Sequence, residues 1–228
     1  MPHKLILFDI DGTLLLSKGA GPRAMLQAGQ RLFGESFIFE VNTAGKIDTQ
    51  IFAELVGLNS HLSFAHEQDR FRDSYLELLT QELGVGTAYT LPGVLALLAT
   101  LREKNDVTLG LLSGNYSLAA PIKLRAAGLE PDWFPVTAFG DEAETRAGLV
   151  PVAMRKYEGL SGTPISTADV IIVGDTPLDV ACAHDNGCVA VAVATGQFSK
   201  SELLETGADL VLGDLSDPSP LFILLEKD

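Results

Sequence analysis

The stretch KLILFDIDGTLL, residues 4–15, starts as an apolar run and ends in two aspartates, Asp9 and Asp11, that are one residue apart. A continuous apolar run of this length is typical of a strand buried on both faces of a parallel sheet. Gly12 follows the second acid and favours a sharp turn. An ordinary turn would explain one acid and a glycine, but it does not require two acids. The pair therefore indicates chemistry at the carboxyl end of a buried strand.

Further apolar runs rich in Val, Ile and Leu predict more strands, at residues 107–112, 170–173, 189–194 and 210–212, with a weaker candidate at 136–139. Helical patterns lie between these runs, over residues 92–104, 117–128, 150–160, 177–187 and 199–207. Alternation of strand and helix implies right-handed crossovers. We therefore expect an α/β fold in which a parallel sheet carries helices on both faces.

Residues 17–88 interrupt this alternation. Three segments in this region predict helices, at residues 21–34, 48–57 and 63–84, while residues 36–41 are short and ambiguous. A helical insertion after the first strand suggests a small cap beside the core. We predict a core domain made of residues 1–16 and 89–228, a helical cap domain of residues 17–88, and hinges near residues 15–19 and 88–92.

Composition narrows the class of protein. The 228 residues include 30 acids and 16 bases, and the net charge of −14 argues against binding to nucleic acid or to an anionic membrane. The two cysteines, Cys182 and Cys188, do not form a C-x-x-C motif, so we expect a reducing cytoplasm and not a disulfide framework. No signal peptide and no apolar run long enough to cross a bilayer is expected.

Three predicted strands end in polar residues. Asp9 and Asp11 follow the first strand, the triplet Ser113-Gly114-Asn115 follows the strand at 107–112, and Asp175, with Asp179 on the next turn, follows the strand at 170–173. In an open parallel sheet, ligands bind beyond the carboxyl ends of the strands near a switch in strand order. We therefore expect these groups to converge on one edge of the sheet.

The convergent residues suit phosphoryl transfer. One of the paired carboxylates can attack as a nucleophile and form an acyl-phosphate, and the other can give and take a proton. Close carboxylates repel each other unless a cation is present, and Mg²⁺ is the natural candidate, with Asp175 as a further ligand and Asp179 in support. The simpler interpretation of residues 174–179 is a helix N-cap at Thr176, and both can hold at once. Residues 111–115 suit phosphate binding or an ordinary turn.

These motifs resemble those of a known family. The segments DIDGTL (9–14), LLSGN (111–115) and GDTPLD (174–179) occur in the order and context found in the haloacid dehalogenase superfamily. The chain is similar to its phosphatase branch with a helical, C1-type cap, which includes phosphoglycolate phosphatases and beta-phosphoglucomutases. The resemblance covers nearly the whole chain, and residues 195–212 are similar to the tail of the phosphoglycolate phosphatases.

The resemblance implies a Rossmann-like core, Mg²⁺ dependence and roles for individual residues. Asp9 would be the nucleophile, Asp11 the general acid/base, and the backbone carbonyl of Asp11 would contact the metal beside Asp9 and Asp175. The phosphate-binding residues would be Gly12, Thr13, Ser113, Gly114 and Asn115. The second acid also favours a phosphatase, because dehalogenases of this superfamily lack it.

One part of the family pattern is missing. A lysine, often as Lys-Pro, usually precedes the last motif and neutralises phosphate, but residues 139–159 contain no Lys-Pro. Arg146 lies near the expected place and Lys156 lies farther along the next predicted helix. We favour Arg146, because arginine binds phosphate through two parallel hydrogen bonds. Both could instead be solvated helix charges, and this is the prediction for Lys123 and Arg125.

The cap is expected to select the substrate. Residues 43–52 contain Gly45 and Lys46, and in the family the corresponding loop contacts substrate. Lys46 would reach a substrate anion, while Asp48 would cap the next helix; an ordinary loop and cap is the alternative. Lys18 and Arg23 are weaker candidates for the same contact. Closure of a cap would exclude water from the reaction.

The predicted function is a Mg²⁺-dependent phosphatase that hydrolyses a small phosphorylated metabolite, phosphoglycolate-like or a sugar phosphate, through an aspartyl-phosphate at Asp9. The alternatives are a phosphomutase of the beta-phosphoglucomutase type and a non-catalytic relative that binds phosphate and Mg²⁺. The expected partner is the metabolite alone, with no nucleic acid and no membrane. The chain would act as a monomer or homodimer.

Overall fold

The computed structural model describes residues 3–62, 64–84 and 86–226. Its centre is a parallel six-stranded sheet with the order β5-β4-β1-β6-β7-β8. The strands are β1 (Lys4–Phe8), β4 (Val107–Ser113), β5 (Val136–Phe139), β6 (Val170–Gly174), β7 (Val189–Val193) and β8 (Leu210–Leu212). Strand β1 lies between β4 and β6, so the three strands that precede the predicted motifs are neighbours. This confirms the α/β fold class.

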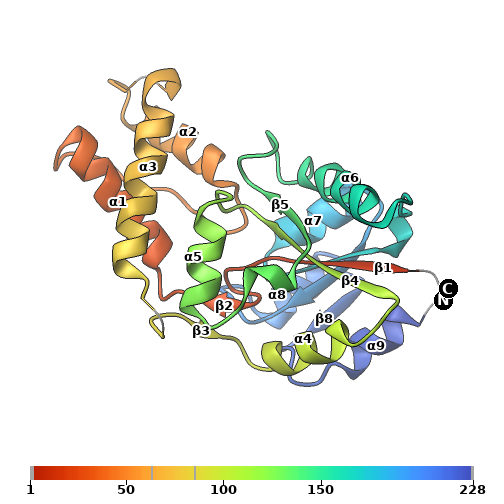
Figure 1. Ribbon diagram of the computed structural model, residues 1–228. Coiled ribbons are helices and arrows are strands. Elements are labelled where there is room, and N and C mark those ends of the chain that lie inside the picture. The colour runs from red at the N-terminus through yellow and green to blue at the C-terminus, as the bar shows by residue number, and fades with distance from the viewer. Residues whose placement is uncertain (1–2, 63, 85, 227–228) are drawn as a thin grey trace.

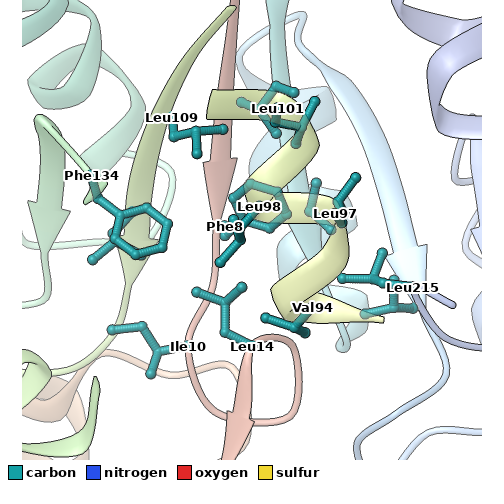
Figure 2. Packing of buried hydrophobic residues seen from close by; sticks show 14 of the residues in the cluster. Phe8, Ile10, Leu14, Val94, Leu97, Leu98, Leu101, Leu109, Phe134 and Leu215 are labelled. Atoms are coloured by element: carbon teal, nitrogen blue, oxygen red, sulfur yellow. The ribbon is translucent and has the colours of Figure 1, made fainter. Parts of the chain in front are cut away.

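Helices cover both faces of the sheet (Figure 1). Ile6 and Phe8 of β1 pack into a cluster with α4 (Val94–Arg102) and α9 (Ser219–Leu225), part of which is drawn in Figure 2. Leu5 and Leu7 pack on the other face against α6 (Leu149–Ser161), α7 (Pro177–Asp185) and α8 (Lys200–Glu205). The alternation follows from the two-residue period of a strand, and burial on both faces explains why β1 is continuously apolar.

Three helices, α1 (Ala20–Phe33), α2 (Asp48–Leu58) and α3 (Phe64–Glu82), lie together beside the sheet (Figure 1). They join the rest of the chain through a two-stranded antiparallel ribbon of β2 (Leu15–Leu16) and β3 (Tyr89–Thr90). Helix α5 (Ala119–Ala126) lies between them and the sheet: Ala120 and Leu124 pack in the sheet cluster, and Ala119 and Ala126 pack with α1–α3.

The weak strand candidate at 136–139 is β5, whereas residues 36–41 form no strand. The short strands β2 and β3 and the helix α9 had no predicted counterpart. Ser63, the first residue of the third predicted cap helix, and residues 1–2 and 227–228 of the predicted core domain lie outside the described residues. In the described part of the chain, no helix is long and apolar enough to cross a membrane.

Candidate active site

Asp9 follows β1 directly and lies on the side of the sheet covered by α6 and α7. Its backbone N–H donates to the carbonyl of Val173 at 2.9 Å, which ties it to β6. Arg146, from the loop before α6, approaches it with a distance of 3.2 Å between Nη2 and Asp9 Oδ1. The same nitrogen donates to Asp179 Oδ1. All three side chains are buried, so this guanidinium serves two acids in a water-poor site, where the attraction between opposite charges is strong.

Asp11 has a different cation. Lys123 Nζ, from α5, lies 2.6 Å from Asp11 Oδ2 and 2.6 Å from Asn115 Oδ1. Lys123 is only 5% exposed. Burial alone would raise the pKa of Asp11, but the ammonium of Lys123 and hydrogen bonds from neighbouring side chains hold it below its ordinary value. Each of the paired acids thus has its own buried positive charge.

The residues after β4 connect the two acids. Asn115 Nδ2 donates to Asp11 Oδ2 at 2.9 Å and to Ser113 Oγ at 2.8 Å, and the Ser113 hydroxyl bonds to Asp9. Register explains the placement, because Leu111 pairs with Phe8 in the parallel ladder and the ends of β4 and β1 therefore meet. A hydroxyl and an amide beside two carboxylates provide hydrogen bonds for a phosphoryl group.

A third acid, Asp175, enters from the end of β6, and one oxygen from each of Asp9, Asp175 and Asp179 lies within 4.8 Å of the others. Asp179 is already occupied: Oδ1 accepts from Arg146, and Oδ2 accepts from the Thr176 backbone N–H at 3.0 Å and from its hydroxyl at 2.7 Å. This is the capping box that begins α7, so the predicted N-cap at Thr176 is confirmed. Among the described residues, the only side-chain hydrogen bond to Asp175 is, by contrast, a long one of 3.4 Å from Thr13.

Burial raises the pKa of Asp9 to about 6 and that of Asp175 to about 8. Burial is the largest cause in both cases, and neighbouring carboxylates add to it, while Arg146 acts in the opposite direction. A cation bound between these carboxylates would stabilise their ionised forms, which burial and mutual repulsion disfavour. Hard oxygen donors of this kind are the ligands that Mg²⁺ prefers. The donor set therefore fits the predicted ion, with Asp9 and Asp175 as the carboxylates that have oxygens to spare.

Glycines leave room for Asp175. A Cβ at Gly12 would lie 2.4 Å from Asp175 Oδ2, and a Cβ at Gly196 would lie 1.7 Å from the same atom. Gly12 also has a φ of +83°, which side chains rarely adopt. The glycine after the two acids is thus required both by the turn and by the carboxylate that β6 brings to it.

The loop before α2 is bonded onto the strand ends. The carbonyl of Gly45 accepts from Arg146 Nη1 at 3.1 Å. The backbone N–H of Asp48 donates to the carbonyl of Gly114 at 2.7 Å, and Asp48 Oδ2 accepts from the Tyr116 N–H at 2.8 Å. Asp48 was expected to cap α2, and this is wrong: it is the first residue of the helix, its carboxylate bonds to the chain after β4, and no side chain caps α2.

A cavity of about 500 Å³ lies between these groups and the helices α1–α3. Its walls include Asp9, Asp11, Ser113, Lys123 and Asp175 on one side and Gly21, Met25, Ile51 and Tyr75 on the other. The strand-end acids therefore face a space that the residues 17–88 help to enclose, and this is large enough for a small metabolite.

Two further basic residues were candidates for binding substrate or phosphate, and only one of them lines the cavity. Lys46 lines the cavity, but its Nζ bonds to both carboxylate oxygens of Glu54 at 2.7 Å; its contact with substrate stays a prediction. Lys156 donates to the Thr137 carbonyl and to Glu142 and does not line the cavity. Between the two alternatives for the missing lysine, the structure brings only Arg146 to the acids.

The two weaker candidates for contact with a substrate anion lie near the first predicted hinge. Lys18 lines the cavity, with its Nζ 5.6 Å from the centre of the Tyr89 ring. Arg23 is half exposed and pairs with Glu82, away from the cavity walls. Neither touches the acids.

The prediction that Lys123 is a solvated surface charge is wrong. Lys123 lies four residues after Ala119 and three before Ala126, so the three share the face of α5 that packs toward α1–α3. Arg125 lies off this face and is exposed, as predicted. The run of small apolar residues at this spacing was the signal for a buried lysine, but nothing in the sequence indicated its partner. Tyr75 and Gly21 were also missed, because they belong to helices without a motif.

The fold and the site define a class of protein: a Rossmann-like α/β core with paired strand-end acids beside a helical segment. The model of the haloacid dehalogenase-like hydrolases matches residues 3–187, and the chain belongs to this family. It is 25% identical to a phosphoglycolate phosphatase of Neisseria meningitidis over 93% of this chain and 90% of that protein. The family and this relative together support the predicted enzyme class, a phosphoric monoester hydrolase.

Solved structures share the fold. CbbY from Rhodobacter sphaeroides, solved in complex with phosphate, has a TM-score of 0.75 at 17% identity, covering 95% of this chain and 96% of that one. A hydrolase from Pseudomonas syringae has a TM-score of 0.71 at 19% identity over 99% and 100%. A putative beta-phosphoglucomutase from Thermotoga maritima has a TM-score of 0.61 at 17% identity over 96% and 98%.

Proposed function

We propose that the protein is a Mg²⁺-dependent phosphatase that hydrolyses a small phosphorylated metabolite through an aspartyl-phosphate on Asp9. The observation that carries this is the pairing of two acids from one strand end with two separate buried cations, Arg146 and Lys123, at the wall of one cavity. A turn or a purely structural acid cluster does not need a separate buried cation for each acid. Two acids with different surroundings are suited to different roles.

In the first step, a carboxylate oxygen of Asp9 attacks phosphorus and forms the acyl-phosphate bond, while the bond from phosphorus to the ester oxygen breaks. Asp11, which must first bind a proton because Lys123 holds its pKa below the ordinary value, gives this proton to that oxygen, and the alcohol leaves. Arg146 lies beside Asp9 and would bind the non-bridging oxygens as their charge develops. Ser113 and Asn115 would donate hydrogen bonds to the same group.

In the second step, Asp11 changes from acid to base, and Asp9 changes from nucleophile to leaving group. Asp11, now a carboxylate, takes a proton from water, and the resulting hydroxide attacks phosphorus. The acyl-phosphate bond breaks, inorganic phosphate leaves and Asp9 is restored as a carboxylate. Lys123 and Asn115 hold Asp11 in place through both steps, because both bond to Asp11 Oδ2.

The carboxylates of Asp9 and Asp175 and the backbone carbonyl of Asp11 would hold Mg²⁺. Asp179 would support these ligands without binding the ion directly. When bound, Mg²⁺ supplies positive charge that lowers the repulsion between the phosphate and the nucleophile. We propose that residues 17–88 act as the cap. The hydrogen bonds of Gly45 to Arg146 and of Asp48 to Tyr116 hold this segment beside the acids, and further closure over a bound substrate would exclude bulk water.

The test is hydrolysis of p-nitrophenyl phosphate with Mg²⁺, with excess EDTA, and by Asp9→Asn. We expect metal-dependent release of phosphate that Asp9→Asn reduces by at least about 10³-fold, since the covalent route is lost. Asp132→Asn is the matched control, because Asp132 is exposed and distant in the fold. Full activity of Asp9→Asn would overturn the assignment of the nucleophile.

A phosphomutase would use the same intermediate but return the phosphate to a sugar. The loop before α2, which is bonded to the chain after β4, is the observation that favours it, because a mutase must keep water from the acyl-phosphate. Isomerisation of a hexose phosphate without release of inorganic phosphate would distinguish it from the phosphatase. A folded, Mg²⁺-binding protein with neither activity would support the non-catalytic alternative.

A further inference from the structure

Tyr75 is a buried tyrosine with an unused hydroxyl. It lies on α3, it is 0% exposed, and its side chain lines the cavity. Its hydroxyl has no hydrogen-bond partner among the described residues. Burying a hydroxyl without a partner is unfavourable, and a buried hydroxyl at a cavity wall indicates a ligand that supplies the missing bond. Burial raises the pKa of Tyr75 well above its ordinary value, so the hydroxyl keeps its proton and can both donate and accept.

Lys123 lies on the same side of the cavity and has a donor to spare. Its ammonium has three N–H groups, and the two acceptors at 2.6 Å are Asp11 Oδ2 and Asn115 Oδ1. Lys123 comes from the core and Tyr75 from the helical segment, so a ligand that touches both would bridge the two parts.

Gly21 on α1 provides the room between these groups. A Cβ at this position would lie 3.3 Å from Lys123 Nζ and 3.8 Å from the Tyr75 hydroxyl. Both polar atoms therefore surround the same point in space, which the absence of a side chain leaves free. Gly21 is inside a helix with no unusual φ, so backbone conformation does not require glycine here.

This small space lies on the leaving-group side of the site. Lys123 bonds to Asp11 Oδ2, and Asp11 would protonate the ester oxygen that leaves. A substrate atom that accepts from Lys123 is thus a near neighbour of the ester oxygen in the substrate, such as a substituent on the next carbon. Phosphate itself would lie beside Asp9 and Arg146, on the other side of the acids.

The surrounding charges decide which substituent fits. The single charge of Lys123 is already paired with Asp11, and Asp48 is a further acid whose charge interacts with both Lys123 and Tyr75. A carboxylate in this space would face two acids with one shared cation. A neutral hydroxyl avoids this repulsion, accepts from Lys123 and exchanges a hydrogen bond with Tyr75.

We infer that Lys123, Tyr75 and the free space at Gly21 form a subsite for a hydroxyl group on the carbon next to the phosphorylated one, so that the substrates are polyol or sugar phosphates. This inference rests on the proposed phosphatase reaction and names the class of its substrate.

The test compares phosphate release from three esters: glycerol 3-phosphate, which has the neighbouring hydroxyl, 2-phosphoglycolate, which has a carboxylate there, and propyl phosphate, which has neither. The readout is the ratio of kcat/KM between the first and the last. We expect Gly21→Ala, which fills the space, and Tyr75→Phe, which removes one hydroxyl, each to lower this ratio by about fivefold, the effect of one hydrogen bond. Alanine also favours the helix, so the first variant should fold.

Two controls match these changes. Gly57→Ala adds a methyl group in α2, where no atom of the described residues lies within 4 Å, and Tyr157→Phe removes a hydroxyl from a buried tyrosine on α6. Both should keep the wild-type ratio. A ratio that Gly21→Ala and Tyr75→Phe leave unchanged, with phosphate still released, overturns the subsite alone. A preference for 2-phosphoglycolate that Gly21→Ala abolishes overturns the hydroxyl assignment, and no release from any ester overturns the proposed function.

Discussion

The two halves of the candidate site solve the same electrostatic problem with different parts of the chain. Around Asp9, the cation is Arg146, and the neighbours Asp175 and Asp179 come from β6 and α7, all within the core. Around Asp11, the cation is Lys123 of α5, whose surroundings include helices of residues 17–88. The first half is buried throughout. In the second, the Asp11 side chain is 38% exposed.

This difference in charge and exposure indicates that the two halves of the site have different roles. The half around Asp9 holds three carboxylates with one arginine, an excess of negative charge that suits a metal and a phosphoryl group. The half around Asp11 has a balanced pair and opens onto the cavity, which suits proton transfer to a leaving group. Chemistry that all substrates share would belong to the first half, and selection among substrates to the second.

Among the variants that separate the two halves of the site, Arg146→Met should have the largest effect. Removing the guanidinium leaves Asp9 and Asp179 buried without their cation, so we expect a loss of about 3 kcal/mol in the free energy of unfolding and roughly a 10²-fold loss of kcat. Urea unfolding without Mg²⁺ and p-nitrophenyl phosphate turnover measure the two effects. Arg155→Met is the control, because Arg155 is exposed on α6. Equal effects of both variants would remove the special role of Arg146.

Asp48→Asn should change how stability depends on pH. Burial raises the pKa of Asp48 from 3.8 to about 7, opposed by Lys123. The folded protein therefore binds more protons than the unfolded chain in this window, and the stability that protonated Asp48 contributes is present below pH 4 and lost as the pH rises through 7. Asparagine does not titrate and still accepts from Tyr116. Between pH 4 and pH 7, the free energy of unfolding of the variant should rise relative to that of the wild type by on the order of 3 kcal/mol. Parallel curves of unfolding free energy against pH for the two proteins would contradict this.

Lys123→Met tests the half around Asp11. Because the Asp11 carboxylate is partly exposed, solvent screens the pair, and we expect a loss of only about 1–2 kcal/mol in unfolding free energy with roughly a tenfold loss of kcat. Arg125→Met on the same helix removes an exposed charge and should change stability by less than about 0.5 kcal/mol. A loss for Lys123→Met as large as that for Arg146→Met would erase the contrast between the halves.

Lys156→Met should have the smallest effect. Lys156 is 40% exposed and pairs with Glu142 at 2.6 Å, so its loss should cost at most about 1 kcal/mol. Turnover should be that of the wild type. A drop in kcat of more than about tenfold would instead restore Lys156 as the substitute for the missing lysine.

Residue order alone predicted the half of the site around Asp9 almost completely. Asp9, Ser113 and Asp175 each stand at the end of an apolar run, and parallel strands bring their carboxyl ends to one edge whatever their order along the chain. Arg146, by contrast, became a candidate only through the family resemblance, which places a basic residue before the last motif. The turn at Gly12 and the cap at Thr176 could also be predicted, because each depends on the conformational preferences of residues that are neighbours in sequence.

The half around Asp11 could not be predicted in this way. Lys123 and Arg125 are alike in sequence, and only the packing of α5 between the sheet and the helices α1–α3 buries one and leaves the other in water. Asp48 could cap its own helix by local rules, yet its carboxylate bonds to Tyr116, 68 residues away. Residue order determines which groups the strands carry to the site, because the strand period is local and a parallel sheet brings the carboxyl ends of its strands to one edge. Tertiary structure alone decided the partners of those groups that come from helices, because a helical face acquires its surroundings only when separate segments pack together.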